Sequence, residues 1–152
     1  MQFAARAERD RFAVFVFRVL LGALFIAHGF PKFQGALHGS AGFVGFARTI
    51  EGLGFHPGVA WAWAVTLVEF VGGICVFVGL ATRMAAALIA IEMVVAGVLV
   101  NGPRGFYWNQ GGFEVPLVFA VLAFLLVLTG PGAPSVDRAI RWERGHEGRP
   151  AL

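Results

Sequence analysis

Residues 12–30 read FAVFVFRVLLGALFIAHGF, an apolar run interrupted by a single charge at Arg18. At 1.5 Å per residue this run extends about 28 Å, which matches a bilayer hydrocarbon core of about 30 Å. Three further apolar runs follow at 59–80, 84–100 and 115–130. The sequence therefore predicts an all-α fold, a four-transmembrane-helix bundle forming one integral membrane domain.

Composition supports a membrane protein. Hydrophobic residues make up 58% of the chain and charged residues 14%, whereas soluble domains carry about 25% charged residues. The pI of about 10.0 comes from basic termini, with a net charge of only +3. No soluble basic face is expected, so nucleic acid is not predicted as a partner. The single Cys75 excludes an intrachain disulfide and is expected to pack as a small apolar side chain.

Basic residues in the connections predict the orientation. One side would carry Arg6, Arg9, Arg11, Arg83, Arg138, Arg141, Arg144 and Arg149. The other side would carry Lys32, Arg48 and Arg104. The positive-inside rule then places both termini in the cytoplasm, as an even number of spans requires.

The connections differ in length. Within the connection 31–58, Ser40 can cap a helix, and apolar residues recur at helical spacing. We expect an amphipathic helix from Ala41 to Leu53, lying in the outer membrane interface. Its apolar stripe would contain Phe43, Phe46, Ile50 and Leu53. The connection 81–83 predicts a tight hairpin with Thr82 as N-cap, and the basic tail 131–152 is expected to be at most a short solvated helix.

Three charged residues lie inside the predicted spans. Counted from the cytoplasmic span ends, Arg18, Glu92 and Glu69 would lie roughly 9, 12 and 16 Å deep. Because intramembrane charges usually pair inside a bundle, we expect these three side chains to form one polar cluster. The cluster could be a static clasp that fixes helix register. It could also be a proton relay or an anchor for a bound headgroup.

A second set of polar and aromatic residues is expected at the outer face. His28 and Lys32 are four residues apart and share one helix face if the helix continues past Pro31. The fourth span opens nearby with Tyr107, Trp108, Asn109 and Glu114. This set would suit a quinone headgroup, with donors for its carbonyls, a proton carrier and rings for stacking. Alternatively, Lys32 extends to the interface and Glu114 complements its own helix N-terminus.

Metal and haem chemistry is not expected from this chain alone. Only His28 lies within a predicted span, whereas bis-histidine haem ligation needs two facing histidines. The sequence shows the same shortage of ligands for a metal site. We therefore predict no metal and no haem ligated by this chain alone, with quinone as the possible cofactor.

Taken in order, four motifs resemble the DoxX family of small four-helix bacterial membrane proteins. They are R-x-x-L-G with H-G-x-x-K over 18–32, E-x-x-G-G with G-x-x-T-R over 69–83, N-x-G-G-x-E-x-P-L over 109–117 and T-G-P-G-x-x-S-x-D over 129–137. Glu92 is outside this pattern. The resemblance implies a bacterial inner-membrane protein associated with quinone-linked respiratory or thiol- and sulfur-oxidising complexes.

The leading hypothesis is a small membrane subunit that binds quinone or lipid between its helices and docks a redox partner. Lys32, His28 and Glu114 would contact the headgroup, and Arg18 and Glu69 would tune the polar interior. A non-catalytic structural subunit of a larger assembly is the alternative, and a small transporter is a weaker one. The residues leave open whether the chain is itself an enzyme, and whether it pairs with other subunits or with copies of itself.

Overall fold

The computed structural model describes residues 2–140, with side chains from residue 9 onward. Arg141, Arg144 and Arg149 of the predicted basic tail lie outside the described residues, as does the side chain of Arg6. Over the described range every regular element is helical, which confirms the all-α prediction. The elements are α1 Gln2–Leu37, α2 Ala41–Gly52, α3 Gly58–Leu67, η1 Val68–Gly72, α4 Gly73–Val78, α5 Thr82–Val95, η2 Ala96–Asn101, η3 Gly102–Arg104, η4 Trp108–Gln110 and α6 Glu114–Thr129.

Four apolar helical segments occupy the positions that the sequence predicts. Three are long enough to cross a bilayer: Arg9–Leu37, Gly58–Val78 and Thr82–Arg104. The fourth, Glu114–Thr129, is shorter at 16 residues and rises about 24 Å. A four-span bundle is compatible with these lengths.

The first helix is longer than its predicted span. The apolar run suggests an end at Phe30, but α1 continues through Pro31 to Leu37. Proline lacks one backbone donor, and membrane helices tolerate that loss where neighbouring helices pack around it. The extension places Lys32 on the same rigid helix as Arg18.

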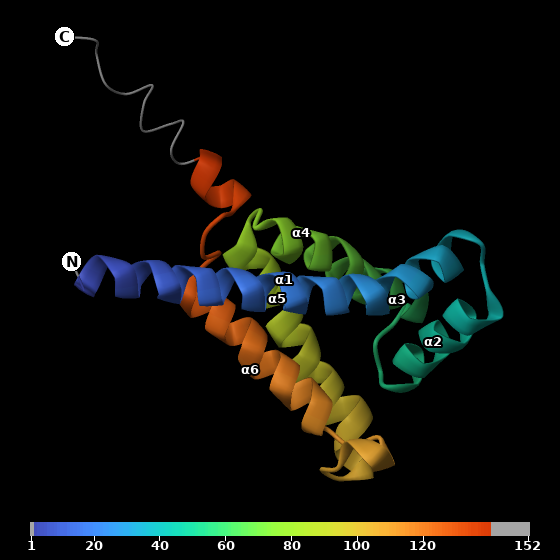
Figure 1. The fold of residues 1–152 in the computed structure, drawn as a ribbon. Coiled ribbons are helices and arrows are strands. Elements are labelled where there is room, and N and C mark those ends of the chain that lie inside the picture. The colour runs from blue at the N-terminus through green and yellow to red at the C-terminus, as the bar shows by residue number, and fades with distance from the viewer. Residues whose placement is uncertain (1, 141–152) are drawn as a thin grey trace.

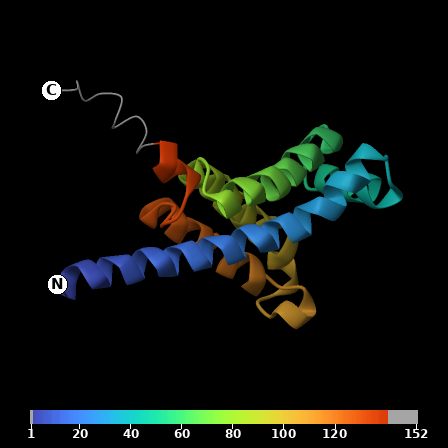
Figure 2. The same cartoon turned by 45° about the horizontal axis from the view of Figure 1, so that its top comes forward.

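The helices form two arms that meet near the chain termini. In Figure 1, α1 runs alongside α3 and α4, whereas α5 and α6 pair with each other and diverge from that first arm. Figure 2 shows the same divergence from a second direction. The backbone N–H of Ala133 donates to the carbonyl of Arg11 at 3.4 Å, so the beginning of α1 and the segment after α6 lie at one end.

Glycines set the contact between α1 and the second span. A Cβ added at Gly22 would overlap the backbone of Phe77, and one at Gly29 would overlap the backbone of Phe70. In the opposite direction, a Cβ at Gly73 would overlap the backbone of Ile26. Small residues at such positions let membrane helices approach closely. The three contacts share one antiparallel register, which fixes the level of every side chain between them.

Apolar side chains fill the bundle interior and also cover its outside. The larger buried cluster contains Leu21, Phe25, Val76, Ala85, Ala86, Ile89, Ala123 and Leu126. Large apolar residues such as Phe12, Met84 and Ile91 are exposed at 61%, 72% and 62%. A soluble protein rarely exposes so continuous an apolar surface, so lipid is expected to contact this surface.

The predicted amphipathic helix forms as α2. The hydroxyl of Ser40 accepts a hydrogen bond from the backbone N–H of Phe43 at 3.2 Å, which confirms the predicted cap. Phe43 and Ile50 are buried against α3, whereas Leu53 follows the helix and is exposed. The apolar face therefore packs largely on protein, and the location of α2 in the membrane interface stays a prediction.

Candidate functional site

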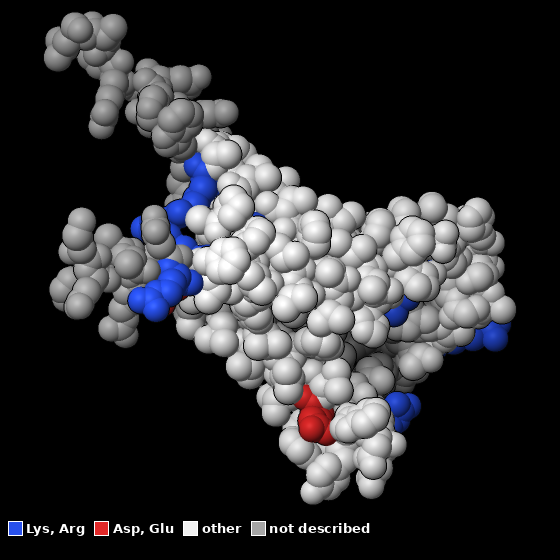
Figure 3. All heavy atoms as spheres, viewed as in Figure 1, with Lys and Arg blue, Asp and Glu red and all other residues white. Residues whose placement is uncertain are grey.

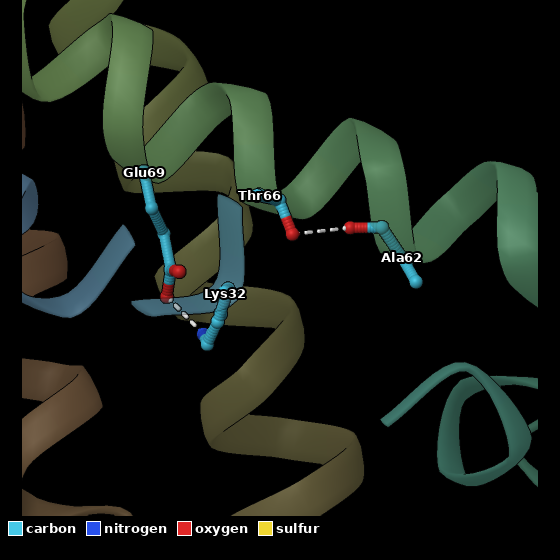
Figure 4. Close-up of polar contacts among 4 residues, drawn as sticks. All are labelled: Lys32, Ala62, Thr66 and Glu69. Atoms are coloured by element: carbon cyan, nitrogen blue, oxygen red, sulfur yellow. Dashed lines mark hydrogen bonds and ion pairs between the residues drawn. The ribbon is translucent and has the colours of Figure 1, made fainter. Parts of the chain in front are cut away.

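An ion pair between α1 and η1 is the centre of the candidate site. Lys32 Nζ lies 2.6 Å from Glu69 Oε1, as Figure 4 shows. The Glu69 side chain is 6% exposed, whereas that of Lys32 is 34% exposed. The pair therefore has a buried carboxylate and a basic side chain that is partly exposed.

Glu69 lies in a π-helical turn of the second span. The segment Val68–Gly72 is wound as a π-helix between the α-helical segments α3 and α4. Such turns are uncommon and occur frequently at functional sites. One turn earlier, the buried Thr66 hydroxyl donates to the carbonyl of Ala62 at 2.7 Å, so it is occupied within its own helix. The hydrogen bond that Glu69 accepts comes from Lys32.

A second carboxyl group reaches the pair from α5. The Glu92 carboxyl group lies within electrostatic range of both Glu69 and Lys32. The Oε2 atoms of Glu69 and Glu92 are buried and have no hydrogen-bond partner among the described residues. The cluster thus holds two acceptor positions that a donor could fill.

One aromatic ring lies against the ammonium group, and others pack nearby. The ring of Phe46, on α2, lies 5.0 Å from Lys32 Nζ, a distance typical of a cation–π contact. Phe33 stacks on Phe70 with ring centroids 4.9 Å apart, and Trp63 packs edge-on against Phe33. Helices α1, α2 and α3 therefore bring rings to one side of the polar cluster.

Open space lies between the two arms on the other side of the cluster. Figure 3 shows a hollow between the arm of α2 and α3 and the arm of α5 and α6. An apolar cavity of about 370 Å³ lies within the other arm, between the end of α5, η2 and α6. Its lining includes Met93, Gly97, Phe113 and Leu117. Met93 follows Glu92 along α5, so this cavity and the second carboxyl group of the cluster are on the same helix.

The structure corrects the predicted triad. Glu92 lies within electrostatic range of Glu69, but Arg18 does not join them. The Arg18 guanidinium donates to the carbonyl of Pro134 at 2.8 Å and lies directly against Gly79. From position 18 to position 32, α1 rises about 21 Å. Lys32 therefore takes the place predicted for Arg18.

The depth count failed because α1 extends past its partner. The register that pairs Gly22 with Phe77 places Arg18 level with the turn that follows α4, which ends at Val78. The apolar residues before Arg18 lie beyond that turn. Counting from the start of the apolar run therefore placed Arg18 too deep.

Arg18 belongs to a polar contact that closes the terminal end of the bundle. The Asp137 carboxylate accepts hydrogen bonds from the backbone N–H groups of Ala81 and Thr82 and from the Thr82 hydroxyl, at 2.7, 3.0 and 3.0 Å. Thr82 was predicted to cap α5. Instead, it is the first residue of that helix, and Asp137 supplies the capping group. Gly79 has φ of 79°, and a Cβ there would overlap the Arg18 guanidinium, so both its backbone and its space require glycine.

The predicted outer set does not gather around Lys32. His28 is exposed one turn before it on α1. The Glu114 carboxylate accepts a hydrogen bond from the backbone N–H of Trp108 at 3.0 Å, within its own connection. That connection lies at the end of the α5–α6 arm, away from α2 and α3 (Figure 1). A single site containing Lys32 with Tyr107, Trp108, Asn109 and Glu114 was therefore a wrong prediction.

The aromatic side of the site was missed by sequence reasoning. Phe46 was assigned only to the stripe of an interfacial helix, and Phe33 and Phe70 were not singled out. The sequence did contain a signal for Phe46, because this residue lies on the connection that leads back to the second span.

Within the part of the chain that the structure describes, no three His, Cys, Asp or Glu side chains converge as a possible metal site.

Comparisons with known proteins agree with the resemblance seen in the motifs. The DoxX family profile matches residues 13–102. The chain is 31% identical to "Putative oxidoreductase CatD" of Bacillus subtilis over 120 residues, 79% of this chain and 81% of that protein. It is 32% identical to "Inner membrane protein YqjF" of Escherichia coli over 127 residues, 84% of this chain and 91% of that protein.

A third relative is "Uncharacterized membrane protein Rv3486" of Mycobacterium tuberculosis, 29% identical over 138 residues, 84% of this chain and 81% of that protein. No solved structure matches the chain significantly. The family match covers the first three apolar helical segments and includes Lys32, Glu69 and Glu92. The chain belongs to the DoxX family of membrane proteins.

Proposed function

We propose that this chain is a small membrane subunit of a quinone-linked redox complex and binds a quinone headgroup beside Lys32, Glu69 and Glu92. The observation that carries the proposal is the buried polar cluster, with acceptor oxygens that have no partner among the described residues and a partly exposed Lys32 side chain beside them. A quinone reduced in the membrane needs both hydrogen-bond donors for its oxygens and a source of protons. Lys32 would supply the first, and the carboxyl pair would supply the second.

The surroundings of the cluster suit the rest of such a ligand. A planar ring can pack against the rings near Lys32, above all Phe46. The apolar cavity that begins at Met93 offers room for the first part of an isoprenoid tail. The word oxidoreductase in the name of the Bacillus subtilis relative is in keeping with a redox role.

A structural subunit is the second candidate, favoured by a different observation. At the terminal end, Arg18 and Asp137 bond to backbone groups of neighbouring segments, and the Arg18 side chain is fully buried. If Lys32 and Glu69 act in the same way, their replacement would lower stability or assembly without any effect on a ligand.

Binding of a short-chain ubiquinone to the purified, detergent-solubilised protein tests the proposal. Trp63 packs against Phe33 next to the cluster, so quinone binding is expected to quench tryptophan fluorescence. The variants Lys32→Gln and Glu69→Gln remove one charge each and should weaken binding about tenfold or more, since a charge-assisted hydrogen bond contributes roughly 1.5–3 kcal/mol.

Two measurements distinguish the candidates. Glu51→Gln is the matched control, because Glu51 is exposed on α2 and pairs with His56 instead. Quinone-linked turnover in membranes containing each variant is measured beside binding. Unchanged binding and unchanged turnover in Lys32→Gln and Glu69→Gln, with normal insertion, would refute the quinone site and leave the structural candidate.

A further inference from the structure

A second cavity, of about 650 Å³, opens at the end of the molecule that holds the start of α1 and the segment after α6. It is separate from the Lys32 cluster, which lies about 30 Å away by the rise of α1 from position 11 to position 32. Its walls come from α1, from the first turn of α5, from the end of α6 and from the segment that follows. The lining residues are Asp10, Arg11, Val14, Arg83, Thr129, Pro131, Gly132 and Arg138.

The charge of this cavity is strongly biased. Arg11, Arg83 and Arg138 face one volume from three different segments, and Asp10 is the acidic residue among the lining. All three arginines are exposed, so the cavity is open to the surroundings. Figure 3 shows Lys and Arg atoms gathered at this end. Three guanidinium groups and one carboxylate leave a surplus of two positive charges, which suits a phosphate group.

The position of the cavity relative to the apolar surface identifies the source of that phosphate. Arg83 lies in the first turn of the third apolar helix and Thr129 ends the fourth, so the cavity lies at the ends of two apolar helices. The adjoining surfaces of α1 and α6 expose Phe12 at 61% and Leu128 at 59%. A ligand with a phosphate at this level and an acyl chain beside these residues matches both features. A free phosphate would match only the arginines and leave the apolar surface without a partner.

We propose that this cavity binds the phosphate of an anionic membrane phospholipid, with Arg11, Arg83 and Arg138 holding the headgroup. Basic pockets between transmembrane helices commonly bind anionic headgroups. The lipid would join α1 to the end of α6 and to the following segment, next to the Arg18 and Asp137 contacts. The bound lipid would thus stabilise the closed end of the bundle, whatever binds at the other end.

Native mass spectrometry of the delipidated protein with added phosphatidylglycerol or phosphatidylcholine tests this site. The double variant Arg11→Gln with Arg138→Gln retains Arg83, which also contacts the Leu128 carbonyl and contributes to the fold. One arginine near an anionic surface contributes about 1 kcal/mol, so the double variant should bind phosphatidylglycerol roughly 30-fold more weakly. Arg104→Gln, in η3 at the far end of the α5–α6 arm, is the matched control and should bind as the native protein does.

The readouts separate a lipid site from a site for a free anion. The native protein should retain phosphatidylglycerol in preference to phosphatidylcholine, and phosphatidylglycerol should raise its melting temperature. Equal retention of both lipids, or equal retention by the double variant, would overturn the proposal. Stabilisation by inorganic phosphate alone, equal to that by phosphatidylglycerol, would assign the cavity to a free anion and refute the lipid. Melting of the lipid-free double variant at the native temperature would show that its fold is intact.

Discussion

Replacing Lys32 by methionine tests the ion pair at the centre of the candidate site. The substitution keeps the length of the side chain and leaves the 6%-exposed Glu69 carboxylate without its ammonium. Removing one partner of a buried ion pair typically costs 3–5 kcal/mol. Two facts lower this value: the Lys32 side chain is one-third exposed, and interhelical hydrogen bonds in membranes average about 0.6 kcal/mol with a maximum near 1.7. We therefore expect Lys32→Met to lower the free energy of unfolding by about 2 kcal/mol.

The reciprocal substitution, at Glu69, should lower the free energy of unfolding by less. Glu69→Gln leaves an ammonium that can still reach solvent and still contact the Phe46 ring, so about 1 kcal/mol is expected. If the two residues interact directly, the double variant should cost about 2 kcal/mol rather than about 3, a coupling near 1 kcal/mol.

The assay is reversible unfolding of the solubilised protein in mixed micelles of increasing sodium dodecyl sulfate content. Arg48→Met is the control for loss of a basic residue, since Arg48 is exposed on α2 and should cost little. Additive effects of Lys32→Met and Glu69→Gln, within about 0.3 kcal/mol, would refute a direct interaction between the pair.

Three further predictions concern packing, capping and the excluded outer residues. Gly29→Leu should lower the free energy of unfolding by about 1–3 kcal/mol, because its Cβ would overlap the Phe70 backbone. Gly45→Leu is the control, since Gly45 has open space around it, and this variant should melt near the native temperature. Equal melting of the two variants would contradict the register of α1 against the second span. Asp137→Ala should cost about 2 kcal/mol and speed amide hydrogen exchange at the start of α5, where three hydrogen bonds are lost; unchanged exchange there would contradict the cap. Glu114→Gln should leave short-chain ubiquinone binding within threefold of native in the fluorescence titration, and a larger loss would return Glu114 to the site.

The helices themselves could be predicted from sequence because hydrophobicity is a local signal. Each apolar run became helical, the first with both ends extended and the other three with ends shifted by a few residues. The cap at Ser40 followed from a hydroxyl placed before an amphipathic stripe. The main error lay at Pro31. Proline ends most helices in soluble proteins, but α1 continues past Pro31, next to the point where Gly29 packs against Phe70.

The site could be predicted only in part because it depends on the register of two helices. Sequence reasoning singled out Lys32, Glu69 and Glu92 as polar groups that must find partners, but it paired Glu69 with Arg18 instead of Lys32. Register is set where Gly22 and Gly73 allow backbones to touch, and no single span contains that information. Spacing in the sequence gives the depth of a residue only relative to the end of its own apolar run. The ends of the first and second runs lie at different levels, so depths counted from them cannot be compared.

Arg18 and Lys32 both lie on α1 and belong to the same family motif, but their contacts indicate different roles. At one end, Arg18 is 1% exposed, donates to the Pro134 carbonyl and leaves no room beside Gly79 for another group. At the other, Lys32 is one-third exposed, and Glu69 retains an acceptor oxygen with no partner among the described residues. Incomplete pairing occurs at both places, since Nε and Nη1 of Arg18 also lack a partner among the described residues, so the difference lies in access. The partly exposed Lys32 side chain lets a ligand reach the acceptor oxygen of Glu69, whereas the fully buried Arg18 offers no such path. Substitution of Lys32 should therefore change both ligand binding and stability, and substitution of Arg18 should change stability alone.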